Sequence, residues 1–121
     1  MTGSTTDTEC TTYMRLDEYQ ELALRTAGHR EGDKEKLTYT ALGLMGESGE
    51  VAETIKKAFY HGHPLDREAL SKELGDVLWY LAVMADALGL SLDRVAEENI
   101  QKLRARYPEG FSEERSRNRA D

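Results

Sequence analysis

Four acidic residues form two pairs with the same spacing. The pairs are Glu47 with Glu50 and Glu73 with Asp76. A separation of three residues places both carboxylates of a pair on one side of an α-helix. If the two segments are adjacent antiparallel helices, the four side chains can meet at one place. An all-oxygen site of this kind favours a hard divalent cation, Mg²⁺ or Mn²⁺, because the cation offsets the repulsion between the carboxylates.

The apolar residues around both pairs recur with the period of a helix. On a helical wheel, segment 36–60 has an apolar arc with the first pair at its margin, whereas Glu53 turns toward solvent. Segment 66–89 repeats this arrangement with the second pair. A lone Glu-x-x-Glu is usually a solvated pair on a helix surface. The repeated placement favours a shared site. Tyr80, on the Asp76 side of its helix, could stack on a base, although an aromatic residue in such a position is more often a packing residue.

The elements that must position these side chains are all predicted to be helical. The expected helices span about 16–28, 36–60, 66–89 and 91–107. Asp17 followed by Gln20 resembles a capping box, and Asp66 and Ser91 suit N-cap positions. The fold class expected is all-α, a four-helix, bundle-like domain at 14–111 that is completed by oligomerisation. A mobile polar tail at 1–13 and a charged tail at 112–121 are expected to flank it.

Composition limits the classes of function. The chain has 121 residues and a net charge of -7, which argues against a broad cationic surface for nucleic acid or an anionic membrane. The beginning of the chain lacks the apolar region of a signal peptide, and a single cysteine, Cys10, cannot form an internal disulfide. These features predict a soluble cytoplasmic protein. The uncharged stretch 77–85, which is too short to span a membrane, has apolar residues on more than one side and predicts a homodimer or homotetramer.

The last predicted helix carries polar residues at its apolar arc. Asn99 falls within the arc, and Lys102 and Arg106 border it. A buried, unpaired amide costs about 1–3 kcal/mol, so Asn99 either makes a structural hydrogen bond or binds a ligand. Lys102 and Arg106 suit phosphate oxygens, and Lys57, near Glu50 on its wheel, is a weaker candidate. A lysine in such a position is usually a surface residue whose stem covers apolar neighbours.

Three stretches together resemble a known family. They are 42–53 (LGLMGESGEVAE), 73–80 (ELGDVLWY) and 99–111 (NIQKLRARYPEGF). The first two look like the metal-binding motifs of the MazG-type all-α nucleoside triphosphate pyrophosphohydrolases, and the third resembles the segment that closes their domain. One departure is Gly46, where many relatives carry another glutamate. That departure leaves open how many metal ions act.

The resemblance implies an enzyme that hydrolyses a nucleoside or deoxynucleoside triphosphate to the monophosphate and pyrophosphate, in a role such as cleaning the nucleotide pool. It implies one or two Mg²⁺ ions held by Glu47, Glu50, Glu73 and Asp76. Either Glu47 or Glu50 would accept the proton of the attacking water. The resemblance also implies that Lys102 contacts the triphosphate.

Three other functions fit parts of the pattern. A phosphoribosyl-ATP pyrophosphohydrolase resembles the same acidic pattern. A non-enzymatic helical interaction module would explain the amphipathic helices, but it gives no reason for the twinned carboxylates. A di-iron carboxylate bundle is disfavoured because it requires two Glu-x-x-His motifs, which the acidic pairs do not provide.

Overall fold

The computed structural model describes residues 13–29 and 32–119, and it is helical throughout these ranges apart from turns and loops. The helices are α2 (Leu16–Leu24), α3 (Asp33–Tyr60), α4 (Arg67–Ala87), α5 (Leu92–Arg106) and α6 (Glu113–Arg117). The predicted all-α class is confirmed. The tail predicted at 1–13 lies outside the described residues, except for its last position.

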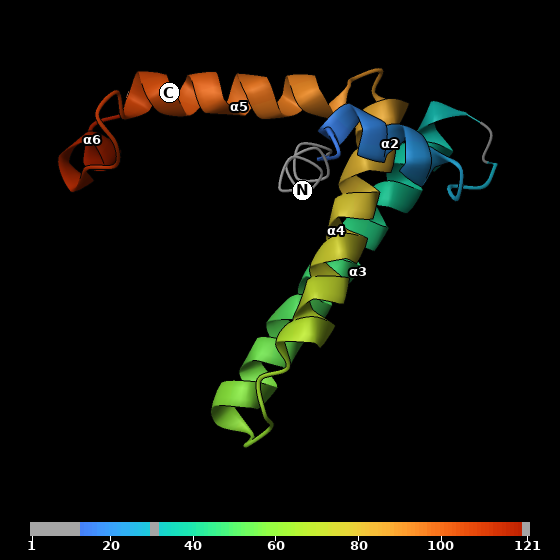
Figure 1. Cartoon of the computed structure of the whole chain (residues 1–121), viewed down its shortest axis with the longest axis horizontal. Coiled ribbons are helices and arrows are strands. Elements are labelled where there is room, and N and C mark those ends of the chain that lie inside the picture. Colours follow the sequence, from blue (N-terminus) through green and yellow to red (C-terminus); the bar gives the residue numbers. More distant parts are fainter. Residues whose placement is uncertain (1–12, 30–31, 120–121) are drawn as a thin grey trace, which may run out of the picture.

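Helices α3 and α4 form a long antiparallel hairpin (Figure 1). The chain reverses in a short loop, where Gly62 has a φ of 77° that favours glycine. The backbone amide of His63 donates to the carbonyl of Lys57 at 3.1 Å. The side chain of Asp66 then caps α4 by accepting a hydrogen bond from the amide of Ala69 at 3.1 Å. The turn thus holds the two helices side by side.

Helix α2 covers only one end of this hairpin. Its Ala23 packs with Ala82 and Ala85 of α4 and with Leu92 of α5 to form a small buried core. Beside this core, the indole Nε1 of Trp79 donates a hydrogen bond to Thr26 Oγ1 at 2.8 Å. The far end of the hairpin has no such cover within the described part of the chain (Figure 1).

Gln20 joins three helices. Its side chain is buried, with 7% exposed. Its Nε2 donates to the carbonyls of Ala82 at 3.0 Å and Leu90 at 3.1 Å, and its Oε1 accepts from the amide of Leu92 at 3.1 Å. These contacts fix the turn between α4 and α5 against α2.

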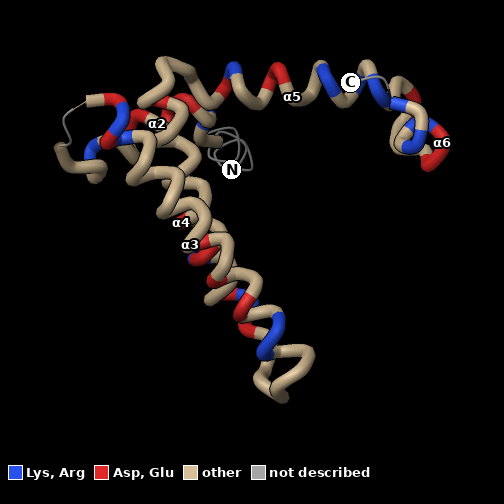
Figure 2. The backbone as a smooth tube through the Cα atoms, turned by 180° about the vertical axis from the view of Figure 1, so that it is seen from behind, with Lys and Arg blue, Asp and Glu red and all other residues tan. Residues whose placement is uncertain are grey.

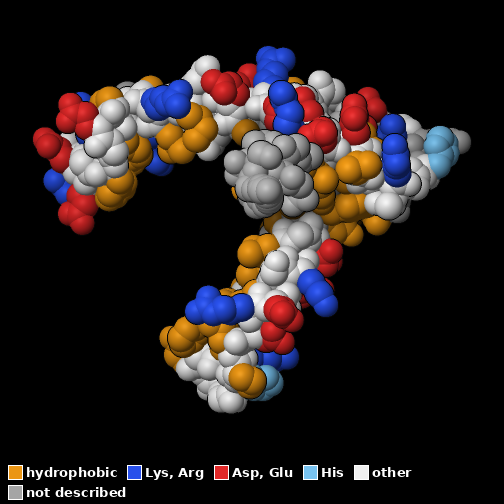
Figure 3. Space-filling model, viewed as in Figure 1, with side chains coloured by type: hydrophobic (Ala, Val, Ile, Leu, Met, Phe, Trp, Pro, Cys, Tyr) orange, Lys and Arg blue, Asp and Glu red, His pale blue; other side chains and the backbone are white. Residues whose placement is uncertain are grey.

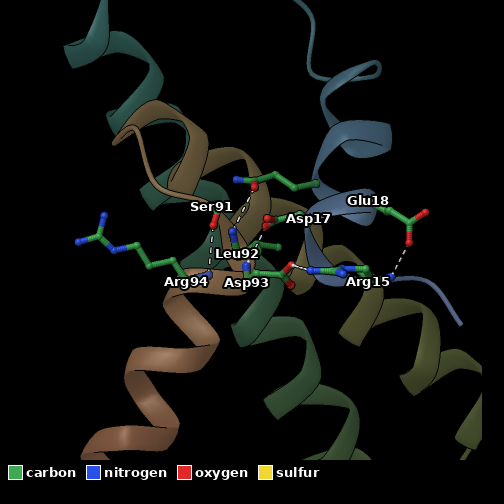
Figure 4. A network of polar contacts seen from close by, with 8 residues as sticks. Arg15, Asp17, Glu18, Ser91, Leu92, Asp93 and Arg94 are labelled. Carbon is green, nitrogen blue, oxygen red and sulfur yellow. Dashed lines mark hydrogen bonds and ion pairs between the residues drawn. The ribbon is translucent and has the colours of Figure 1, made fainter.

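The start of α5 is held by a second set of contacts from the beginning of α2 (Figure 4). Asp17 Oδ1 accepts a hydrogen bond from the amide of Asp93 at 2.8 Å, and Arg15 pairs with the Asp93 carboxylate at 3.3 Å. Ser91 caps the helix by accepting from the amide of Arg94 at 3.1 Å. The direction of α5 is therefore set at its first turn.

Beyond that turn, α5 leaves the hairpin as an arm (Figure 1). The chain bends by 100° between α4 and α5, so the four long helices do not close into a bundle within one chain. Among the described residues, no single helix is long and apolar enough to cross a membrane, although α4 and α5 together pass that test despite their bend.

The segment 112–121, predicted to be only a charged tail, contains the short helix α6. Ser112 caps this helix by accepting a hydrogen bond from the amide of Arg115 at 3.0 Å. The helix has five residues, which is too short to show an apolar period. Before it, the ring of Phe111 packs against that of Tyr107, with centroids 5.3 Å apart.

Candidate metal centre

The structure brings the four predicted carboxylates together in the middle of the hairpin. One oxygen each from Glu47, Glu73 and Asp76 lies within 4.8 Å of the other two. Glu50 makes a side-chain hydrogen bond with Glu73. Residues three apart on each helix thus meet across the antiparallel interface, as their spacing requires.

Among the residues that the structure describes, no Lys or Arg forms an ion pair with any of the four carboxylates. Glu47 Oε1 is buried and has no hydrogen-bond partner among the described residues. Burial, together with the negative charges of Glu50 and Asp76, raises the pKa of Glu47. The hydrogen bond with Glu50, burial and the neighbouring carboxylates raise the pKa of Glu73. Both shifts mean that the ionised forms are disfavoured in the absence of a cation.

These residues fit a small divalent cation. Oxygens on opposite sides of Mg²⁺ are about 4.2 Å apart, since each bond is about 2.1 Å long. The three-oxygen set is held within 4.8 Å, so small side-chain movements suffice to close it. The buried, unpaired oxygen of Glu47 would gain a partner. An all-carboxylate donor set is also the one that Mg²⁺ and Mn²⁺ prefer.

Tyrosines border the end of the site nearest to α2. The hydroxyl of Tyr80 is hydrogen-bonded to Tyr39, and their ring centroids are 5.9 Å apart. This bond, burial, and the negative charges of Glu47 and Asp76 raise the pKa of Tyr80. Tyr80 therefore lies close to the carboxylates, although its pattern was interpreted as packing. Tyr80 also packs, as predicted, because its ring lies against the backbone of α3 at Gly43.

The contact between Gly43 and Tyr80 sets how closely the two helices approach. We expect Gly43→Ala to lower the free energy of unfolding by about 1–3 kcal/mol, because the added Cβ would collide with the Tyr80 ring. Gly46→Ala is the matched control, since no described atom lies within 4 Å of a Cβ there. That change should instead stabilise the helix by about 0.5–1 kcal/mol. Urea unfolding would measure both, and equal stabilities would contradict the close approach.

The predicted substrate-binding residues lie elsewhere in the single chain. Lys57 pairs with Glu53 at 3.9 Å, two turns along α3 from Glu50. Asn99 is exposed, so the expectation that it is buried in an apolar arc is wrong. The reason is that the described part of the chain places no helix alongside this part of α5.

Lys102 and Arg106 line a cavity of about 510 Å³ between α5 and α6. They do not approach the carboxylates of their own chain, because α5 leads away from the hairpin (Figure 1). The sequence identified their charge correctly. It could not show the direction of the helix that carries them.

Two of three comparisons with known proteins found a match. A protein from Mycobacterium phage L5, named only as Gene 37 protein, is 38% identical over 105 residues, which cover 80% of this chain and 92% of that protein. No solved structure matches significantly. The family described as the MazG nucleotide pyrophosphohydrolase domain matches residues 35–111, which include all four carboxylates. The chain belongs to this family.

Proposed function

We propose that the protein is a Mg²⁺-dependent hydrolase of nucleoside or deoxynucleoside triphosphates that releases the monophosphate and pyrophosphate. The observation that carries the proposal is the carboxylate cluster with its buried, unpaired Glu47 oxygen, inside the segment that matches the family. Such a cluster destabilises the fold through repulsion between its carboxylates unless a cation offsets that repulsion. We place the reaction in the cytoplasm, where these nucleotides are found.

The carboxylates divide into two roles in this proposal. Glu47, Glu73 and Asp76 would hold the cation, since their oxygens form the compact set. The bound Mg²⁺ would supply positive charge to the phosphate oxygens and to the leaving pyrophosphate. Glu50 lies next to Glu73 but outside this three-oxygen set, so we assign it as the base that accepts a proton from water. The water oxygen then bonds to the α-phosphorus as the bond to the pyrophosphate oxygen breaks.

Phosphoribosyl-ATP hydrolysis remains the second candidate, because it breaks the same kind of bond with the same acidic residues. A helical module that only binds a partner would explain the apolar surfaces. It would not explain why four carboxylates meet with no neutralising Lys or Arg among the described residues, since the lysines that follow on α3, Lys56 and Lys57, pair with Glu53 instead.

The test is a substrate screen with purified protein and Mg²⁺. The panel holds each nucleoside and deoxynucleoside triphosphate, common damaged nucleotides and phosphoribosyl-ATP, and both products are quantified. We expect monophosphate and pyrophosphate in equal amounts from at least one triphosphate, and none in excess chelator. Release of inorganic phosphate alone, or no turnover of any nucleotide, would refute the proposal. Turnover of phosphoribosyl-ATP alone would establish the second candidate.

A further inference from the structure

A small cavity lies between α2, α3 and α4, at the end of the hairpin that α2 covers. Its volume is about 120 Å³. Apolar side chains from α4, from α2 and from the turn after α2 form its walls, among them Leu24, Ala27, Val83 and Ala87. Apolar side chains are visible beneath α2 at this end of the hairpin, next to charged ones (Figure 3). The cavity therefore combines an apolar wall with a polar border.

Two unpaired charges supply that polar border. Lys36 and Asp86 both line the cavity, and neither forms an ion pair with the other or with any other described residue. Both signs of charge occur at this end of the hairpin (Figure 2). The buried Thr40 also lines the cavity, but its hydroxyl donates to the carbonyl of Lys36 at 2.8 Å. Hydrogen bonds to a ligand would thus come from the lysine and the aspartate.

The cavity follows the metal centre along the same faces of both hairpin helices. Val83 comes seven residues after Asp76, and Thr40 comes seven residues before Glu47. Seven residues make almost two complete turns, so each pair shares a helix face at a separation of about 10.5 Å. The cavity therefore lies two turns from the carboxylate cluster, on the side of α2.

Two tyrosines connect the cluster with the cavity. Tyr80 borders the carboxylates one turn after Asp76, and its hydroxyl is hydrogen-bonded to Tyr39. Tyr39 in turn lines the cavity. A nucleotide whose α-phosphate is bound at the cluster can pass its sugar along these rings and direct its base to the cavity.

We propose that this cavity binds the base of the substrate and selects a pyrimidine, with Asp86 and Lys36 as the residues that read the edge of the base. The inference rests on the proposed function and adds the substrate class. Size supports a single ring, since an apolar cavity of about 150 Å³ holds benzene and leaves no room for a second ring. The edge of a pyrimidine carries an N–H donor next to an oxygen or nitrogen acceptor. A carboxylate accepts from the former, and an ammonium group donates to the latter.

Binding of nucleoside monophosphates tests the selection without requiring turnover. The probes are the deoxycytidine, deoxyuridine, thymidine, deoxyadenosine and deoxyguanosine monophosphates, titrated by calorimetry in the presence of Mg²⁺. We expect at least one pyrimidine to bind roughly tenfold or more tightly than either purine. The kcat/KM values of the matching triphosphates should show the same order.

A variant with both Lys36→Met and Asp86→Asn tests the two reading residues. Its kcat/KM for the preferred pyrimidine should fall roughly ten- to hundredfold, as expected when hydrogen bonds to charged groups are removed. The purine values should stay close to those of the wild type, so that the selectivity is lost. Lys34→Met is the matched control, because Lys34 is exposed on the same helix and does not line the cavity. Circular dichroism checks that each variant is folded.

Each result decides the inference. A purine that binds as tightly as the pyrimidines, no binding of any monophosphate, or wild-type selectivity in the folded double variant would overturn it. These outcomes leave the proposed function intact if any triphosphate is hydrolysed. A wild-type protein that hydrolyses no nucleotide would refute the proposed function instead. In that case a pyrimidine preference that depends on Lys36 and Asp86 would still support the base pocket.

Discussion

Replacing either Glu47 or Glu73 with glutamine should abolish Mg²⁺-dependent turnover while the helical fold remains intact. Each change keeps the shape of the side chain but removes a charge from the three-oxygen set. Loss of a residue that merely orients a metal ligand costs about 10–100-fold, and loss of a ligand itself should cost at least about 100-fold. Pyrophosphate release measures the loss, and circular dichroism checks the fold.

When metal is absent, the same two variants should be at least as stable as the wild type, although they lose turnover. The pKa values of Glu47 and Glu73 are raised in the folded protein, so their contribution to stability is present below the ordinary value of 4.5 and is lost as the pH rises through the folded values. At neutral pH, glutamine removes this repulsion, and the metal-free variants should melt at or above the wild-type temperature. Added Mg²⁺ should stabilise the wild type but not the variants.

Glu53→Gln provides the control for both measurements. Glu53 is on the same helix but pairs with Lys56 at 3.2 Å, away from the cluster. Its substitution should leave turnover and the Mg²⁺ response unchanged. Wild-type turnover in both Glu47→Gln and Glu73→Gln would remove the cluster from the mechanism.

Gln20→Ala should lower the free energy of unfolding by about 2–4 kcal/mol. The change leaves two carbonyls and one amide of the junction between α4 and α5 without their present partner. A buried group left unsatisfied costs about 1–3 kcal/mol, and water that enters the vacated space recovers part of that cost. Urea unfolding measures the loss, and activity should fall as well because α5 is no longer held in its direction.

Gln101→Ala is the matched glutamine control. Gln101 is exposed on α5 and bonds only to Glu97, four residues earlier, at 3.1 Å among the described contacts. Its loss should change stability by no more than about 0.5 kcal/mol. If the two glutamine variants unfold at the same urea concentration, Gln20 does not join the helices as the geometry indicates.

The sequence predicted the parts of the structure that depend on local periodicity. The two carboxylate pairs could be found because residues three apart must share a helix face, and an antiparallel hairpin brings two such faces together. The N-caps predicted at Asp66 and Ser91 are confirmed. These two N-caps depend on contacts within four residues along the chain.

Features that depend on contacts distant in sequence were missed. The capping box predicted from Asp17 and Gln20 is wrong, because both side chains bond to the α4–α5 junction instead. Helix α2 begins after Arg15, whose amide donates to Glu18. The direction of α5 could not be predicted for the same reason, since it is fixed by residues more than 70 positions away.

The loop at 61–66 has a consequence for how such chains vary in length. It lies about 15 Å along α3 from Glu50, while the register of the two helices is set at Gly43 and Tyr80 on the other side of the carboxylates. Residues added or lost at this tip leave every carboxylate oxygen of the cluster in place. One residue deleted between Gly43 and Glu47 would rotate the first acidic pair by about 100° relative to that contact. Insertions and deletions among relatives are therefore expected to collect at the tip, which is also where a reporter sequence could be grafted.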